Sequence, residues 1–280
     1  ITLLLLMCAP IFPYYFWQSA EMFLYALVTC GAVSLVNQQF KLSALFISVA
    51  GTLNATVMAF GFFVIILFVY QSVVVFKKVH DRFRPVIFVK ENVKRTLLLA
   101  ACYIPFVVVA IFNTVEYGGP VPQMVIGQGV SEGWGGRFWA HFFDLNIGFV
   151  LYVPLLLVAL LAGIVLGLAR KKLFGLLYVA GFLLFVLAYS RTWHINSGST
   201  GISRYNAWAL PILVLYATAI LPALFSSRRL KMALAGLLSA SCVVSGVSAT
   251  DLPFSSSYLA FSPLAQLSLI LISQPTSLLY

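Results

Sequence analysis

Long apolar runs separated by short polar breaks limit the folds open to this chain more than any other feature. Two of them, Ala55 to Phe76 and Ile147 to Leu168, contain no charged side chain. A helix needs roughly 20 apolar residues to cross about 30 Å of hydrocarbon, and lipid requires its backbone polar groups to be paired internally. Charged residues make up only 9% of the chain, against about a quarter in a soluble domain. The pattern therefore predicts an integral membrane protein built from helices.

We predict an all-α fold, a polytopic transmembrane bundle of about eight or nine membrane helices over residues 1–250. The apolar segments are Thr2 to Trp17, Met22 to Val36, Leu42 to Leu53, Ala55 to Phe76, Thr96 to Phe112, Ile147 to Leu168, Leu173 to Tyr189, Ala207 to Leu224, and Met232 to Val247. Leu42 to Leu53 is too short to span a membrane alone. Residues 251–280, where Ser and Pro alternate with short apolar pieces, are predicted to form an outer-face tail that could carry one interfacial helix.

The basic residues predict the orientation of the bundle. Fourteen of the seventeen Lys and Arg residues fall in one alternating set of breaks, the largest of which is Lys77 to Arg95. The other set holds only Arg137, Arg191 and Arg204. Because positive charge stays on the cytoplasmic side, the second set is expected to face outward. Two outer loops follow from this assignment, at residues 113–146 and 190–206.

Several classes of function are excluded or left without support. The net charge of +10 would indicate a nucleic-acid partner in a soluble protein, but here the positions of the basic residues account for it, and no nucleic acid is expected. Each of the four cysteines lies alone in a different apolar run, so we expect packing residues instead of a metal site or disulfide. No Walker loop, HExxH, GxSxG or Rossmann fingerprint is present.

The outer loop 190–206 contains the strongest candidates for ligand binding. Arg204 precedes an apolar run, and its planar guanidinium suits the oxygens of a lipid phosphate at that depth. Tyr205 and Arg191 lie in the same loop, and His194 could pair with a phosphate or transfer a proton. The alternatives are an aromatic belt position for Tyr205 and a surface position for His194.

The longer outer loop, residues 113–146, offers acidic and amide groups. Glu116 or Glu132 could act as a base, and Arg137 could pair with one of them. Asp144 and Asn146 could bind a divalent metal or take a proton from an acceptor hydroxyl. The alternative for these two residues is capping of the following helix. The sequence leaves open whether a metal cofactor is needed.

Four short stretches, in chain order, resemble motifs of the membrane glycosyltransferases of the GT-C superfamily. They are Val49 to Thr56, Phe112 to Pro120, Asp144 to Pro154, and Ser203 to Pro211. They are similar to the family's short-helix break, the entry to an outer loop, the stretch after that loop, and the arginine–tyrosine helix start seen in many bacterial members. The basic residue usual in the first motif is Asn54 here.

The resemblance implies transfer of a sugar from a polyprenyl-phosphate donor to an envelope acceptor, in a bacterial inner membrane with the site facing the periplasm. It makes the lipid bilayer and the polyprenyl-phosphate sugar the expected partners. It also implies an inverting mechanism with an aspartate in the first outer loop. The corresponding loop here, Gln18 to Glu21, has no acidic pair. We therefore expect this chain to be a C-terminal fragment whose catalytic acidic loop precedes Ile1, or else a non-catalytic relative. Arg204, Tyr205, Arg191 and His194 then become donor-phosphate ligands.

Two other functions stay open. A transporter or flippase of lipid-linked saccharides should carry ionisable groups midway along its helices. In this chain the polar residues gather at the outer ends of the apolar runs, which favours the enzyme. A membrane assembly protein is the third interpretation, and in it the outer loops would be docking surfaces.

Overall fold

The computed structural model describes residues 21–79, 85–120, 134–144, 148–171, 173–191 and 203–224, with the single residues 232 and 236. Every element in these residues is a helix, and none of them lies in a strand. The prediction of an all-α fold is confirmed for this part of the chain. The predicted segment Thr2 to Trp17 and the tail 251–280 lie outside the described residues, as does nearly all of Met232 to Val247.

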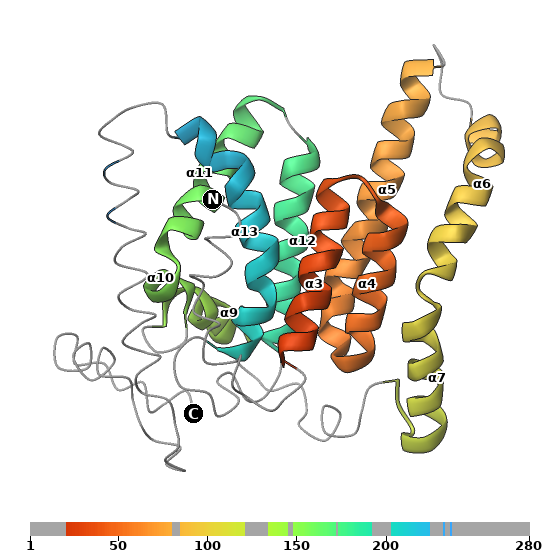
Figure 1. The fold of residues 1–280 in the computed structure, drawn as a ribbon, viewed down its shortest axis with the longest axis horizontal. Helices are drawn as coiled ribbons and strands as arrows, with labels where there is room; N and C mark the ends of the chain where they lie inside the picture. Colours follow the sequence, from red (N-terminus) through yellow and green to blue (C-terminus); the bar gives the residue numbers. More distant parts are fainter. Residues whose placement is uncertain are drawn as a thin grey trace.

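Six helices pack side by side into a bundle (Figure 1). They are α3 (Glu21–Val36), α4 (Phe40–Leu53), α5 (Met58–Val79), α11 (Pro154–Ala169), α12 (Leu173–Tyr189) and α13 (Arg204–Leu224). Helix α13 contacts α3, α11 and α12, while α4 contacts α3 and α5. At one edge, α6 (Pro85–Ala101) and α7 (Ile104–Tyr117) pack on the bundle mainly through α4. Among the described helices, α13 therefore lies between α3 and the pair α11 and α12.

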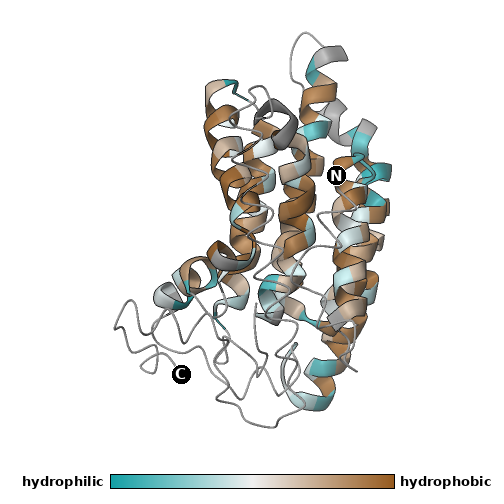
Figure 2. Ribbon diagram, turned by 60° about the vertical axis from the view of Figure 1, so that its left-hand side comes forward, coloured by the Kyte–Doolittle hydropathy of each residue, from teal (hydrophilic) through white to brown (hydrophobic). Residues whose placement is uncertain are grey.

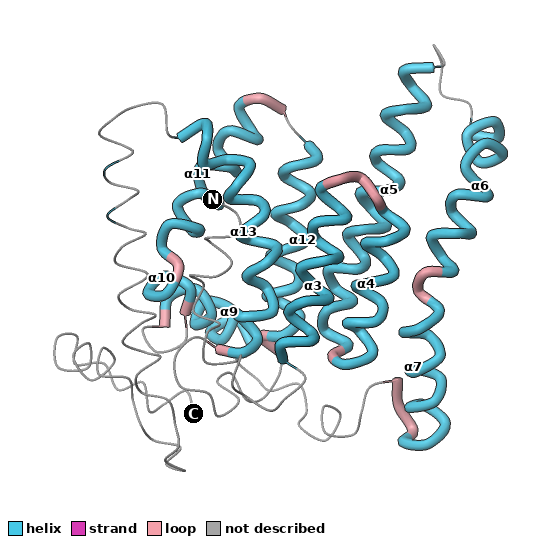
Figure 3. Tube along the Cα trace, viewed as in Figure 1, coloured by secondary structure: helices cyan, strands magenta, loops and turns pink. Residues whose placement is uncertain are grey.

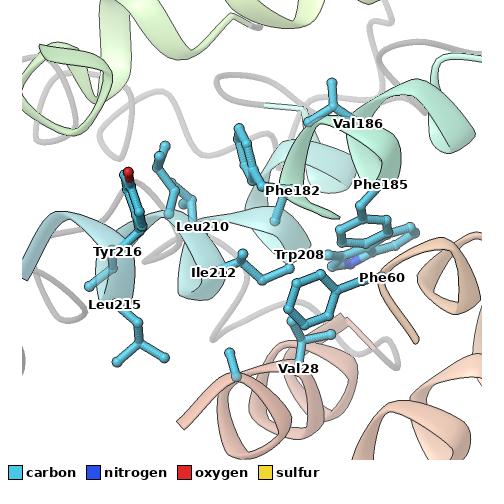
Figure 4. Packing of buried hydrophobic residues seen from close by; sticks show 14 of the residues in the cluster. Val28, Phe60, Phe182, Phe185, Val186, Trp208, Leu210, Ile212, Leu215 and Tyr216 are labelled. Atoms are coloured by element: carbon cyan, nitrogen blue, oxygen red, sulfur yellow. The ribbon is translucent and has the colours of Figure 1, made fainter. Parts of the chain in front are cut away.

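The core is built around α13, in which every residue from Tyr205 to Ala217 is buried. A helix that is apolar all round is expected to be surrounded by other elements, and α13 follows this rule. Figure 4 shows Trp208 of α13 gathered with Phe185 of α12 and Phe60 of α5. Because apolar side chains from several helices meet here, the position of α13 is fixed along most of its length.

Two predicted segments are each divided into two helices, and in both cases the reason is local. The predicted helix Thr96 to Phe112 is two helices, α6 and α7, bent by 48°, because Pro105 cannot donate a backbone hydrogen bond and clashes with the preceding turn. The segment Ile147 to Leu168 is likewise divided into α10 (Phe149–Tyr152) and α11, and the break falls just before Pro154.

The two predicted loops also contain helices. The basic loop Lys77 to Arg95 consists largely of the end of α5 and the start of α6. The outer loop 113–146 includes the end of α7 and the helix α9 (Trp134–Phe143). The predicted break after Leu53 is present, because a short 3₁₀ turn, η1 (Ala55–Val57), separates α4 from α5. Figure 3 shows how short the described loops between the bundle helices are.

The two ends of the bundle differ in their charged residues. The basic end, at the top of Figure 1, contains the start of α4, the end of α5 and the α11–α12 turn, with Lys41, Lys77, Arg170 and Lys171. The loop end, at the bottom, contains the C-termini of α7 and α12, the helix α9 and the N-terminus of α13. Figure 2 shows apolar residues over most of each bundle helix and hydrophilic residues toward the helix ends and along α6. The charge asymmetry read from the sequence is therefore an asymmetry between two ends of the fold.

Helix length supports membrane insertion only for part of the chain. By length and composition one described helix, Ala55–Lys77, is able to cross a membrane, and the bent pair Asn92–Ala101 and Ile104–Tyr117 would be a second span if it acts as one. The other apolar helices of the described residues have 10–17 residues. Short apolar helices are compatible with membrane association, but helix length alone does not establish eight or nine spans.

Candidate functional site

Three polar side chains form a buried cluster at the loop end. His141 comes from α9, Tyr189 is the last residue of α12, and Asn206 lies in the first turn of α13. The Tyr189 hydroxyl donates a hydrogen bond of 2.9 Å to Asn206 Oδ1. Asn206 Nδ2 in turn donates to the backbone oxygen of His141 at 3.0 Å. This His141 cluster, made of the three residues, ties together three helices that are far apart in the sequence.

His141 is fully buried and packs edge-on against Tyr189, with ring centroids 4.7 Å apart. Burial lowers the pKa of the His141 imidazole to about 3, because the charged ring would lose its hydration, and the neighbouring Asn206 amide offsets only part of this. The ring is therefore neutral at physiological pH. Within the described part of the chain, neither ring nitrogen has a hydrogen-bond partner. A neutral imidazole offers one donor and one acceptor.

Aromatic rings continue the cluster toward α13. Tyr205 stacks on Tyr189 with centroids 5.8 Å apart and planes 14° apart. Trp208 packs edge-on against Tyr205 at 4.8 Å. Tyr205, predicted to contact a donor phosphate, is thus buried between two aromatic rings. Its position shows that it helps to hold the start of α13 in place.

The first turn of α13 is capped by Ser203. The backbone N–H of Tyr205 donates to Ser203 Oγ at 3.3 Å, and the N–H of Ala207 donates to the Ser203 carbonyl at 3.0 Å. Serine at this position satisfies helix N–H groups that have no partner inside the helix. Arg204 is the first residue of α13. The backbone of Arg204 is therefore fixed between a helix cap and an aromatic stack.

The other predicted ligands of the 190–206 loop are only partly described. Arg191 is exposed and follows the last turn of α12, so its chain position is at the loop end with Arg204. The side chain of Arg204 and all of His194 lie outside the described residues. The structure thus places the backbones of Arg191 and Arg204 at the same end of the bundle, and their role as phosphate ligands stays a prediction.

The predicted residues of the 113–146 loop are not gathered into one site. Glu116 is exposed on the last turn of α7, which lies at the far edge of the molecule from α9 (Figure 1). Arg137 is half-buried in α9, and Asp144 follows the end of that helix. Glu132 and Asn146 lie outside the described residues. Glu116 therefore does not belong to the His141 cluster.

Helix capping by Asp144, the alternative considered from the sequence, is not what the backbone adopts. Gly148 occupies the N-cap position of α10. The Asp144 carbonyl instead accepts a hydrogen bond of 2.8 Å from the Gly148 N–H. The role of the Asp144 carboxylate stays a prediction.

Metal ligands are not clustered in the described part of the chain, where no group of three or more His, Cys, Asp or Glu residues could hold an ion. Cys30 and Cys102 are both free thiols there. The sequence also contains no CxxC motif, in which two cysteines separated by two residues bind a metal. A need for a divalent metal therefore stays open for the residues outside this part.

Sequence reasoning did not single out His141, Tyr189 or Asn206. Asn206 offered a signal, because a polar amide between Tyr205 and Trp208 at the start of an apolar helix must find a partner when it is buried. His141 offered little signal in the sequence, because its burial depends on the contact of α9 with α12, which joins segments that are distant in the chain. The burial of a histidine in a glycine-containing segment predicted as loop is visible only in the fold.

No family model matches the chain, and comparison with curated proteins and with solved structures gave no match. The resemblance to the GT-C glycosyltransferases therefore rests on the four short motifs alone. Two of these motifs coincide with structural boundaries. Val49 to Thr56 contains the break between α4 and η1, and Ser203 to Pro211 contains the capped start of α13.

Proposed function

We propose that this chain is part of a multi-pass membrane glycosyltransferase that transfers a sugar from a polyprenyl-phosphate donor to an envelope acceptor at the loop end. The observation that carries the proposal is the fixed start of α13, where Arg204 begins a capped helix held by the His141 cluster. A helix N-terminus carries a partial positive charge, and an arginine there adds a full one. Both favour a phosphate group.

Membrane placement is supported by the surface of the fold. Helix α7 exposes an almost continuous row of aliphatic side chains, and Val115 is 74% exposed. In water such a face would be a large apolar patch, whereas in lipid it is the expected surface. The separation of the basic end from the loop end fits the positive-inside rule. We propose a bacterial inner membrane as the location, with the loop end toward the periplasm.

Arg204 has the central role in this proposal. Its guanidinium would bind the donor phosphate through two parallel hydrogen bonds, and Arg191 would add a second positive charge from the adjacent helix end. Tyr205 would act by holding the first turn of α13. Since the described residues supply no paired carboxylates at this end, we assign donor binding to this part of the chain and leave the catalytic base unassigned.

Binding of a radiolabelled polyprenyl-phosphate sugar to the full chain in liposomes tests the proposal. Hydrogen bonds to charged groups contribute about 1.5–3 kcal/mol, so Arg204→Ala should weaken donor binding by about tenfold or more. The matched control is Arg170→Ala, which removes an exposed arginine from the basic end. Unchanged donor binding in Arg204→Ala, or equal loss in both variants, would refute the assignment.

The transporter interpretation lacks a specific observation in its favour. Among the described residues with placed side chains, no Lys, Arg, Asp or Glu is buried. Intramembrane ionisable groups are the usual mark of a substrate or proton path. In the liposome experiment, movement of the labelled lipid across the bilayer without donor-dependent transfer would support a flippase instead.

A further inference from the structure

A cavity of about 630 Å³ lies at the basic end, opposite to the His141 cluster. It is lined by the α3–α4 turn, the start of α4, the second half of α5 and the middle of α6. Ligand pockets in proteins typically have volumes of about 300–1,000 Å³. The cavity is therefore large enough for a headgroup and the first part of an attached chain.

The lining of the cavity includes two cations and several amides. Lys41 comes from the first turn of α4 and Arg95 from α6. Among the residues that the structure describes, the lining contains no acidic side chain. Two cations on different helices, with amide groups beside them, form an environment that suits phosphate oxygens.

The amides are held in place by a hydrogen bond across the cavity. Gln71 Nε2 of α5 donates to Gln38 Oε1 of the α3–α4 turn at 3.2 Å. Gln38 has a φ of 59°, in the left-handed region that glycine usually occupies at a helix end. The backbone bonds of the turn follow the pattern of such an end, with the Gln39 N–H donating to the Ser34 carbonyl at 2.8 Å. A glycine here would form the same turn but could not make the bond to Gln71.

Apolar side chains of α4 and α5 also line the cavity. Phe76 of α5 is buried, and Phe68 of α5 packs edge-on against Phe40 of α4 at 5.7 Å. Leu42 and Val75 are about half exposed, so the apolar part of the lining reaches the outer surface. The lining thus combines cationic and amide groups with apolar side chains.

We propose that this cavity binds an anionic phospholipid, with the phosphate held by Lys41 and Arg95 and the acyl chain lying along Leu42 and Val75. The apolar part of the lining favours a lipid over a soluble phosphate ester, which has no apolar group to place there. The lipid-site proposal and the proposed glycosyl transfer both require that the chain lies in a membrane, and they have nothing else in common. It concerns the other end of the fold and uses none of the residues assigned to the donor.

Native mass spectrometry of the detergent-purified full chain, titrated with phosphatidylglycerol, tests the lipid site. We expect Lys41→Gln/Arg95→Gln to weaken retention of phosphatidylglycerol by about tenfold or more. The matched control is Arg170→Gln/Lys171→Gln, which removes two exposed basic residues from the same end but outside the cavity. Thermal unfolding of both double variants verifies that they fold.

Three results would overturn the proposal of a lipid site. The first is equal retention of phosphatidylglycerol by the native chain and by Lys41→Gln/Arg95→Gln. The second is an equal loss in the control variant, which would mean a diffuse effect of surface charge. The third is competition by glycerol phosphate at the same concentration as the lipid, which would identify a soluble phosphate ester as the ligand.

A further variant sharpens the experiment. Val75→Asn should weaken retention of phosphatidylglycerol, because it makes the apolar part of the lining polar and leaves Lys41 and Arg95 in place. Unchanged retention in Val75→Asn would contradict the proposed placement of the acyl chain. Since the lipid site uses none of the residues assigned to the donor, either proposal can fail without the other.

Discussion

Acidification should destabilise this protein through His141. In the folded chain the pKa of the buried imidazole is about 3, whereas the pKa of an unperturbed histidine is near 6.5. Between these two values the unfolded chain binds a proton that the folded chain does not. Stability that is present above pH 6.5 is therefore lost progressively as the pH falls toward 3.

The size of this effect follows from the same two values. Each pH unit within the window changes the free energy of unfolding by about 1.4 kcal/mol for one group. Between pH 6.5 and pH 5 the loss from His141 alone should be about 2 kcal/mol. Most folded domains are stable by about 5–15 kcal/mol, so the loss is measurable.

Unfolding of the full chain in detergent, followed at several pH values from 7.5 to 5, measures the dependence. His141→Phe keeps an aromatic ring edge-on to Tyr189 but cannot bind a proton, so its stability should vary much less with pH. Tyr189→Phe is the matched control, because it loses the bond to Asn206 and retains the imidazole. Its stability should fall by about 1 kcal/mol at every pH, with the native slope. Parallel losses in the native chain and His141→Phe would refute the idea that burial keeps this ring neutral.

Two further substitutions test the packing and the capping of α13. A Cβ at Gly163 of α11 would lie 2.7 Å from Tyr216 Cζ, so Gly163→Val should lower the free energy of unfolding by about 1–3 kcal/mol in denaturant titrations. Among the described residues, a Cβ at Gly135 of α9 meets no atom within 4 Å, so Gly135→Ala should be neutral or slightly stabilising. An equal loss in both variants would contradict the packing argument. Ser203→Ala should cost about 1 kcal/mol and Ser203→Asp should retain the cap, whereas equal stability of the two would mean that the cap contributes nothing.

The helices with charged residues at both ends were predictable from the sequence. Helix α12 begins at Leu173 and ends at Tyr189, as predicted, because Lys171 and Arg191 interrupt the apolar run on either side. Helix α6 was not predictable in this way. It contains Lys90, Lys94 and Arg95, and a helix at the edge of the bundle can expose such residues along its length.

The candidate site was only partly predictable. The position of Arg204 at a helix start followed from the apolar run after it, and its place at the loop end followed from the alternation of charge. The His141 cluster did not, because it depends on contacts between α9, α12 and α13 that join distant parts of the chain. Local patterns give the ends of helices, whereas which helix ends meet is decided by packing over the whole bundle.

The burial of α13 has a consequence for how the protein assembles. Helix α13 is synthesised after α3, α11 and α12, and its residues Tyr205 to Ala217 fill the space between these three helices. Until this segment has left the ribosome, the faces of the three helices that contact α13 lack that partner. A chain interrupted before Arg204 would therefore expose those faces to chaperones, lipids or other chains.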